Sequence, residues 1–304
     1  MNIGGVYSLE GKIETEALSV VVAQIPFLDA QNQDDLNKNL ENLLKYMDKA
    51  SVGFPGFDLF VAPEECIQGT IGSPYLSIDL DGPEVKKLKE KCIELKIWGI
   101  FDFLVQEGEH EFLRNIAIMI NDKGEIVHKY TKMNPWIPGE YTYPGSECPV
   151  TPGPKGSKIA TIICADGDYP EIWREAAYNG ANVIVRVSAY MAPFQEAATI
   201  TNRACAYCNQ VYVIYCNRVG TPDDNAYTFY GNSSFTGPDG NVYAEAPPGA
   251  TWLFKANVYP GIIDHMRKQS PDYNFSYQYR HRGASCPDFK GVGDLRNPYK
   301  ASDY

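Results

Sequence analysis

The 304-residue sequence has no uninterrupted apolar run long enough to cross a membrane, and its first residues lack the basic start and apolar segment of a signal peptide. These two absences predict a cytosolic protein with no membrane partner. Basic residues are also in the minority, with 27 Lys and Arg against 38 Asp and Glu and a net charge of −11. No run of Lys or Arg overrides this balance, which disfavours nucleic acid as a partner.

A disulfide framework and a complete zinc set are also missing. The eight cysteines are spread through a large chain without a signal peptide, which predicts mostly free thiols. Cys205 and Cys208 have CxxC spacing, but they stand in a helical pattern without a second CxxC or paired histidines. We therefore expect packed thiols there. The alternative, a redox or metal protein that uses this pair, predicts bound zinc or a readily formed disulfide.

What the sequence does contain is an alternation of strand and helix patterns over most of its length. Apolar runs predict strands at Ser19–Ile25, Asp58–Ala62, Ile97–Val105, Ile116–Ile120, Glu125–Tyr130, Lys158–Ile163, Val183–Val187, Val211–Tyr215, Ser233–Thr236, Val242–Ala246 and Trp252–Val258. Helices are predicted to begin near Asp34, at Pro83 and near Pro170, and to span Glu196–Asn209.

Turn residues complete this pattern. The segments 121–124 (NDKG) and 237–240 (GPDG) predict hairpins, and the rest predicts helices layered on a mixed sheet. We interpret residues 1–304 as a single α/β domain. The polar tail from about 287, rich in Gly, Pro and Tyr, is expected to lie on the surface or on a neighbouring subunit.

Three of the predicted strands lead to a polar or reactive side chain: Glu64, Lys132 and Cys164. Sites in α/β sheets gather at the carboxyl ends of strands, so one crevice can receive all three groups. A carboxylate can take the proton of a thiol, and an ammonium can stabilise the oxyanion formed when that thiol attacks an amide. Spacing alone leaves a second interpretation open, a buried core thiol with two solvated or ion-paired charges.

The segments around these residues resemble the nitrilase superfamily of carbon–nitrogen hydrolases, and most closely its aliphatic amidase and formamidase branch. The resemblance extends from about Leu18 to the region of His281. Its motifs, in the order and spacing of the family, are WGIF at Trp98, GEIVHKY at Gly124, KYTKMNPWIPGEYTYPG at 129–145, GPKGSKIA at Gly153 and ICADGDYPEIWREAAYNGANVIVR at 163–186.

The family implies a four-layer α-β-β-α sandwich, in which two mixed sheets are flanked by helices. It also implies a homo-oligomer built from subunit pairs, which in many members extends to hexamers or larger rings. No metal or organic cofactor is implied. None of the four histidines lies in the matched catalytic motifs, which disfavours a Cys–His mechanism.

By position, the resemblance assigns Glu64 as the general base, Lys132 as the oxyanion-side lysine and Cys164 as the nucleophile. The backbone N–H of Ala165 would complete the oxyanion site. Glu140 matches a second glutamate that orients the lysine and the substrate amide.

Further positions match residues around the family's site. Trp136 and Tyr190 correspond to pocket-lining aromatic residues of the amidase branch, although core packing also explains such residues. Asp166 matches an acidic residue of the nucleophile turn and is expected to brace it.

Two departures from the branch affect the substrate. Glu65 stands where these amidases usually have tyrosine, and Met133 and Asn134 replace two apolar residues. The side chain of Glu65 either points away or adds a negative charge to the site. If it points inward, an anionic substrate is disfavoured and a cationic or strongly hydrogen-bonding substrate is favoured.

The sequence therefore predicts a cysteine-dependent amidase that converts a small aliphatic amide or formamide to a carboxylic acid and ammonia through a thioester. One alternative is an N-carbamoyl or ureido hydrolase of the same superfamily, which would need a basic pocket for a carboxylate. A true nitrilase is disfavoured because the loop after Lys132 resembles the amidases. A non-catalytic binding protein on the same scaffold is the remaining alternative.

Overall fold

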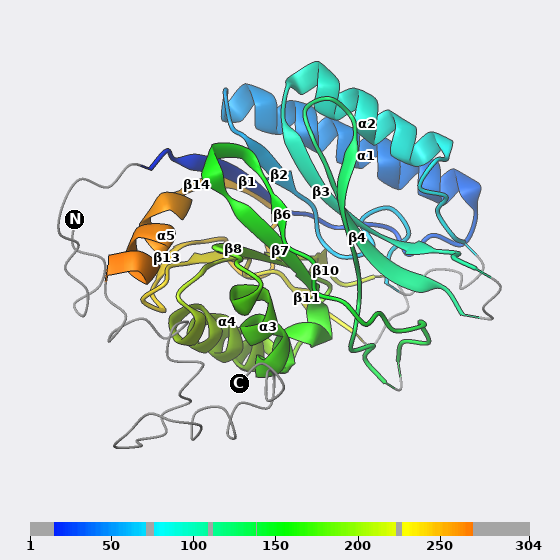
Figure 1. Ribbon diagram of the computed structural model, residues 1–304. Helices are drawn as coiled ribbons and strands as arrows, with labels where there is room; N and C mark the ends of the chain where they lie inside the picture. Colours follow the sequence, from blue (N-terminus) through cyan, green and yellow to red (C-terminus); the bar gives the residue numbers. More distant parts are fainter. Residues whose placement is uncertain (1–14, 71–75, 109–111, 138, 223–226, 270–304) are drawn as a thin grey trace.

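Two six-stranded sheets pack face to face in a computed structural model that describes residues 15–70, 76–108, 112–137, 139–222 and 227–269 (Figure 1). Helices cover the outer faces of both sheets, which gives the four layers α-β-β-α (Figure 1). The expected sandwich of two mixed sheets is thus confirmed. The predicted surface tail and Cys286 lie outside the described residues.

The first sheet has the strand order β14-β1-β2-β3-β4-β5. Its strands are β1 (Leu18–Gln24), β2 (Leu59–Val61), β3 (Trp98–Val105), β4 (Arg114–Ile120), β5 (Ile126–Thr131) and β14 (Trp252–Val258). β1, β2 and β3 are parallel, whereas β14, β4 and β5 pair antiparallel with their neighbours. β5 consequently runs in the direction of β2, and both strands point their carboxyl ends the same way.

The second sheet has the order β13-β12-β9-β8-β7-β6. Its strands are β6 (Thr151–Pro152), β7 (Lys158–Ile163), β8 (Val183–Ser188), β9 (Tyr212–Asn217), β12 (Ser234–Thr236) and β13 (Val242–Glu245). The three central strands β7, β8 and β9 are parallel, and the outer pairs are antiparallel. A separate two-stranded ribbon joins β10 (Val219–Gly220) to β11 (Phe229–Tyr230).

Four of the five helices in the described residues form the two outer layers, and α5 (Pro260–Gln269) lies at one end of the sandwich near β13 and β14 (Figure 1). The other four are α1 (Gln33–Gly53), α2 (Pro83–Leu95), α3 (Pro170–Tyr178) and α4 (Gln195–Asn209), with short 3₁₀ turns η1 (Pro154–Gly156) and η2 (Cys164–Asp168). α1 and α2 lie side by side on the first sheet, and α3 and α4 lie against the second.

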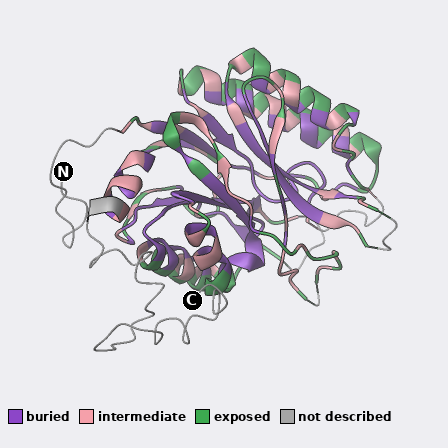
Figure 2. Ribbon diagram, viewed as in Figure 1, coloured by how far each residue is buried: buried purple, intermediate pink, exposed green. Residues whose placement is uncertain are grey.

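Strand β1 shows how the layers are held together. Leu18, Val20 and Val22 belong to the core between the two sheets, whereas Val21 and Ala23 belong to the core beneath α1 and α2. Side chains alternate across a strand, so an unbroken apolar run supplies both cores. Figure 2 shows the strands largely buried and the exposed residues concentrated on the helices' outer faces.

Elements with strong local signals form where the sequence predicts them. The side chain of Asn32 accepts a hydrogen bond from the N–H of Asp35 and so caps α1. Both predicted hairpins form, as β4–β5 and β12–β13, and Gly124 and Gly240 adopt positive φ in their turns. The pattern did not indicate β6, β10, β11 or α5. The three strands are only two residues long, which is too short to show the alternation of apolar and polar residues that predicts a strand.

None of the helices in the described residues is both long and apolar enough to cross a membrane. The seven described cysteines are not joined in disulfides, in agreement with the expectation of mostly reduced thiols. Cys205 and Cys208 lie on α4, the first buried and the second exposed, so the CxxC pair is not a disulfide either.

Stability below neutral pH is expected to depend on His128, which is buried between the hydroxyls of Thr151 and Thr161 at 2.8 Å from each. Burial lowers the pKa of His128 to about 4, against about 6.5 for an unfolded histidine. Above pH 6.5 both states are neutral there. Between pH 6.5 and 4 the histidine is protonated in the unfolded chain but stays neutral in the folded chain. The free energy of unfolding should therefore fall by about 2–3 kcal/mol between pH 7 and pH 4.5.

Urea unfolding at pH 7 and pH 4.5 measures this loss. His128→Gln should lose less stability than the wild type over the same interval, because it removes the titrating group. Both proteins retain every carboxylate, so acid effects of Asp and Glu cancel in the comparison. Equal losses in the two proteins would show that His128 does not set this pH dependence.

Candidate active site

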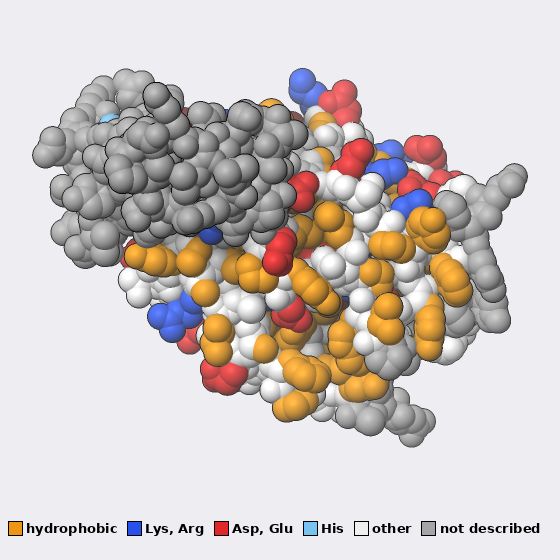
Figure 3. Space-filling view, turned by 60° about the horizontal axis from the view of Figure 1, so that its bottom comes forward, with side chains coloured by type: hydrophobic (Ala, Val, Ile, Leu, Met, Phe, Trp, Pro, Cys, Tyr) orange, Lys and Arg blue, Asp and Glu red, His pale blue; other side chains and the backbone are white. Residues whose placement is uncertain are grey.

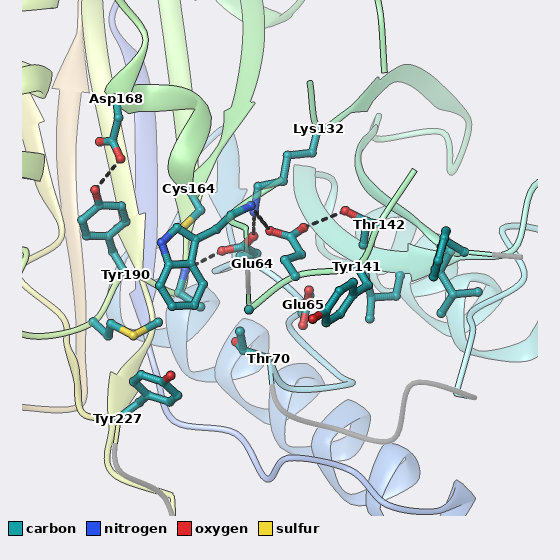
Figure 4. A pocket seen from close by; sticks show the side chains of 18 of the residues that line it. Glu64, Glu65, Thr70, Lys132, Tyr141, Thr142, Cys164, Asp168, Tyr190 and Tyr227 are labelled. Atoms are coloured by element: carbon teal, nitrogen blue, oxygen red, sulfur yellow. Dashed lines mark hydrogen bonds and ion pairs between the residues drawn. The ribbon is translucent and has the colours of Figure 1, made fainter. Parts of the chain in front are cut away.

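Three strand ends from the two sheets meet at one cavity of about 890 Å³. Glu64 follows β2, Lys132 follows β5, and both strands belong to the first sheet. Cys164 follows β7 of the second sheet. All three residues line the cavity, where Figure 4 shows their side chains gathered together.

The structure brings most of the remaining predicted site residues to the same cavity. Glu65, Glu140, Trp136 and Tyr190 line it. Ala165 is buried directly after the nucleophile candidate, and its side chain is not part of the lining.

Lys132 is the centre of the charged network. Its Nζ lies 2.8 Å from Oε1 of Glu64 and 2.5 Å from Oε2 of Glu140. Burial alone would lower the pKa of Lys132, but the two carboxylates outweigh it and hold the pKa well above its usual value. The lysine is therefore a fixed cation at neutral pH, and it has two bound partners.

Glu64 is held from several sides. Its Oε2 accepts a hydrogen bond from the backbone N–H of Ala189 at 2.8 Å, at the end of β8. Its Oε1 accepts from Nδ2 of Asn115 at 2.9 Å, beside Lys132. The same amide nitrogen of Asn115 lies 3.2 Å from Glu140, so it ties the two carboxylates together.

Glu140 is fixed within its own loop. It accepts hydrogen bonds from the backbone N–H of Trp136 at 3.0 Å and from the hydroxyl of Thr142 at 3.0 Å. Burial would raise the pKa of Glu140, but the charge and hydrogen bond of Lys132 lower it overall. This loop therefore presents an ionised carboxylate to the lysine.

Cys164 occupies a sharp turn directly after its strand. Its φ is +45°, in the left-handed region that non-glycine residues seldom adopt, and η2 begins at this residue. Burial raises the pKa of the Cys164 thiol, Glu64 raises it further, and the opposing effect of Lys132 is smaller. The resting thiol is therefore protonated at neutral pH and needs a base.

Ala165 is the second residue of η2. Amides in the first turn of a helix have no acceptor within that helix, so the Ala165 N–H is a suitable donor to an oxyanion beside Cys164.

Arg186 supports the turn at Cys164. Although it lies within the apolar strand β8, it donates from Nε and Nη2 to the carbonyl oxygen of Cys164, at 3.0 and 2.7 Å. Nη2 also lies 3.2 Å from Oδ1 of Asp168, whose other oxygen accepts a hydrogen bond from the hydroxyl of Tyr190 at 2.6 Å. A Cβ at Gly167 would approach Arg186 to 2.1 Å, so the turn has room only for glycine there.

Asp166 joins this turn to the loop that carries the lysine. One of its oxygens accepts from the N–H of Ile163 and the hydroxyl of Tyr130, at 3.0 and 2.7 Å. The other accepts from the backbone and side-chain nitrogens of Asn134, at 2.8 and 3.0 Å. Asp166 thus braces the turn as expected, and Asn134, one of the two departures from the amidase pattern, is its partner.

Sequence reasoning missed Asn115, Arg186, Asp168 and Thr142 as site residues. Two of them could have been recognised from the sequence, since Asn115 and Arg186 are polar residues inside otherwise apolar strands. Such residues are buried only with partners, so their positions alone marked them for attention. Asp168 ends the short turn η2 and Thr142 lies in a polar loop, and nothing local distinguishes either residue.

The carboxylates of Glu64, Glu65 and Glu140 have oxygens within 4.8 Å of one another, a geometry that could hold a metal ion. The ammonium of Lys132, however, already lies between Glu64 and Glu140. The position between Glu64 and Glu140 that a metal ion would take is therefore filled by the ammonium of Lys132.

Arg186→Met is expected to destabilise the fold and to lower activity. The change leaves the Cys164 carbonyl without its two charged donors, which costs about 1–3 kcal/mol. Urea unfolding measures that cost, and Lys129→Met is a suitable control because its pair with Glu107 is partly exposed and worth at most about 1 kcal/mol. An equal loss in both variants would contradict a supporting role for Arg186.

A family model described as "Carbon-nitrogen hydrolase" matches residues 19–267 of the chain. The matched segment includes all the residues that line the cavity.

Two curated relatives cover most of the sequence. A formamidase of Helicobacter acinonychis is 32% identical over 274 residues, which cover 88% of this chain and 81% of the relative. A formamidase of Photorhabdus laumondii is 33% identical over 259 residues, which cover 83% of this chain and 76% of the relative.

Solved structures share the fold at lower identity. Nit3 of Saccharomyces cerevisiae, a member of branch 10 of the nitrilase superfamily, has a TM-score of 0.71 and 23% identity, covering 87% of this chain and 98% of its own. An amidase from Nesterenkonia sp. has a TM-score of 0.70 and 21% identity, covering 84% of this chain and 95% of its own.

Proposed function

The chain belongs to the carbon–nitrogen hydrolase family, and we propose that it hydrolyses a short primary amide to a carboxylic acid and ammonia through Cys164. The observation that carries this proposal is the arrangement of one thiol, one ammonium and two carboxylates around a single cavity. The formamidase relatives support an amide as the substrate.

The proposed reaction has two halves. Glu64 takes the thiol proton as the sulfur of Cys164 attacks the amide carbon. The oxyanion of the tetrahedral intermediate is stabilised by Lys132 and the N–H of Ala165. Glu64 then gives its proton to the leaving nitrogen, and ammonia departs. Glu64 next removes a proton from water, which attacks the thioester carbon. The C–S bond breaks, the acid leaves, and Glu64 returns the proton to the Cys164 thiolate.

Two features of the site support this division of roles. Burial and the charge of Glu64 keep the pKa of the Cys164 thiol above its ordinary value, so a base is needed at the moment of attack. Glu140 and Asn115 hold the lysine and Glu64 in place without the substrate. The charged groups are therefore pre-arranged, which is the condition for effective electrostatic stabilisation.

An N-carbamoyl amino acid is a less suitable substrate. Such a compound carries a carboxylate that needs a basic partner. Among the described residues that line the cavity, Lys132 is the only Lys or Arg, and it is already bound to two glutamates. The described lining also includes the carboxyl groups of Glu65 and Asp168, and neither can pair with the carboxylate of such a substrate as a cation would.

The test is an ammonia-release screen over formamide, acetamide, propionamide, cationic amides, nitriles and N-carbamoyl amino acids, with products identified by mass spectrometry. We expect acid and ammonia from at least one primary amide. Turnover only of nitriles or carbamoyl compounds would replace the proposal with the corresponding activity. A complete lack of turnover would favour a binding protein on this scaffold.

Pairing of subunits and a cytosolic location stay predictions. Apolar side chains are widespread on the face shown in Figure 3, which supports an association between copies of the chain. Measurement of the mass in solution tests the oligomer, and fractionation of cells tests the location.

A further inference from the structure

Glu65 points into the cavity, although it directly follows Glu64. In an extended strand two successive side chains would face opposite ways. Here the φ of Glu65 is +50°, so the chain turns and both carboxyls reach the same cavity. The N–H of Glu65 donates to Oδ1 of Asp102 at 2.8 Å, and its carbonyl accepts from Gln68 and Gly69, so the turn is firmly held.

The carboxyl of Glu65 is buried but poorly satisfied. The residue is 3% exposed, and its Oε1 lies 3.5 Å from Nδ2 of Asn115, which is closer to Glu64 and Glu140. Its Oε2 has no hydrogen-bond partner among the described residues. Buried polar atoms normally have partners, so an unpaired carboxyl oxygen on a residue that lines the cavity marks this side chain as a candidate to bind a ligand.

The charges nearby do not provide that partner. Lys132 is held by Glu64 and Glu140, and it is the only Lys or Arg among the described lining residues. Burial and the charges of Glu64 and Glu140 raise the pKa of Glu65 well above its usual value, which is the response of a carboxyl that has no compensating donor. A donor on the ligand would supply what the chain lacks.

The cavity has room for such a ligand. Its volume of about 890 Å³ falls in the range of pockets that hold drug-sized molecules, far more than formamide requires. Figure 4 shows the Glu65 carboxyl near Tyr141, beyond Glu64 as seen from Cys164. An acyl chain attached at Cys164 would need a substituent at its far end to reach Glu65.

We propose that Glu65 determines specificity, and that the preferred substrate is a short primary amide whose acyl chain carries a hydrogen-bond donor, an amino or hydroxyl group, that binds the Glu65 carboxyl. This inference rests on the proposed function, because it assumes that an amide lies at Cys164. A binding site built for a substrate N–H or O–H rejects the analogue that lacks it, because the protein's polar group is then left unpaired.

The test compares amides of equal size that differ only in the terminal group. One set is butyramide, 3-hydroxypropionamide and 3-aminopropionamide, and a shorter set is propionamide, glycolamide and glycinamide. We expect kcat/KM of the wild type to be at least about tenfold higher for a donor-bearing member than for its alkyl match. Comparison of the amino member, which is a cation, with the neutral hydroxyl member distinguishes a charge interaction with Glu65 from a neutral hydrogen bond.

Variants of Glu65 locate the cause. Glu65→Met has a similar length and no acceptor of comparable strength, so it should remove the preference and favour the alkyl amides. Glu65→Gln keeps an acceptor without the charge, so it should remove a preference for the amino amide while keeping one for the hydroxyl amide. The matched control is Asp264→Asn, a carboxylate outside the cavity that pairs with Lys158 at the surface and should leave the ratios within about twofold.

The outcomes separate this inference from the proposed function. If the wild type hydrolyses amides with equal ratios, or if Glu65→Met keeps the wild-type ratios, the inference is overturned and the amidase proposal stands. If no amide is hydrolysed, the amidase proposal fails, and calorimetric binding of the same sets to Cys164→Ala decides the inference. A donor-bearing member that binds at least about tenfold more tightly supports it, and equal or undetectable binding overturns it.

Discussion

Cys164→Ala is expected to lower ammonia release at least about 10⁴-fold, to the background of the uncatalysed reaction, while the fold remains intact. Cys164 is the only cysteine among the described residues that line the cavity. Without its sulfur no covalent intermediate can form, and the remaining groups can only bind and polarise the amide. Ammonia release under saturating substrate measures the loss.

The fold of this variant should change little. The side chain of Cys164 is small, and the hydrogen bonds that hold its turn are made by its backbone carbonyl, which alanine keeps. Thermal unfolding checks this point. Cys208→Ser is the matched control, since Cys208 is an exposed cysteine on α4 and should keep full turnover. Undiminished turnover by Cys164→Ala would falsify the assignment of the nucleophile.

Glu64→Gln is the second change with a large expected effect. We expect kcat to fall by about 10²–10⁴, the usual contribution of a general base. Glutamine has nearly the same shape as glutamate but cannot accept a proton. Because the pKa of the Cys164 thiol lies above its ordinary value, the thiolate is scarce at neutral pH and the lost base is not replaced by spontaneous ionisation.

The structural cost of this variant has to be measured beside its kinetics. Glu64 accepts hydrogen bonds from Lys132, Asn115 and the N–H of Ala189, and a glutamine amide would meet at least one of these donors with its own NH₂. The unfolding free energy is therefore expected to fall by about 1–3 kcal/mol. Urea unfolding separates this loss from the loss in kcat.

Glu140→Gln provides the comparison for Glu64. Both residues contact Lys132, but Glu64, unlike Glu140, also affects the pKa of the Cys164 thiol appreciably. If Glu64 is the base, kcat should fall about tenfold further in its variant than in Glu140→Gln. Equal losses would assign both carboxylates the role of fixing Lys132.

Much of the fold followed from local patterns in the sequence. The run at β1 supplies both cores because strand side chains alternate, and the apolar positions of α1, from Leu36 to Met47, follow the helical repeat. Glycines with positive φ closed both predicted hairpins. The residues Glu64, Lys132 and Cys164 stood out because each follows an apolar strand, and the resemblance of the surrounding motifs assigned their roles.

The tertiary structure decided what lies between these segments. It placed Cys164 on a different sheet from Glu64 and Lys132, so the site forms at the junction of the two sheets. It also brought Asn115 and Arg186 to the site, whose partners are distant in sequence.

The direction of Glu65 could not be read from the sequence. Strand alternation would turn it away from Glu64, but a left-handed backbone held by Asp102 turns it into the cavity. Sequence patterns record periodicity along a single segment. The orientation of a side chain after a strand end depends instead on hydrogen bonds from other segments, and here the bond to Asp102 helps to hold the turn that brings Glu65 to the cavity.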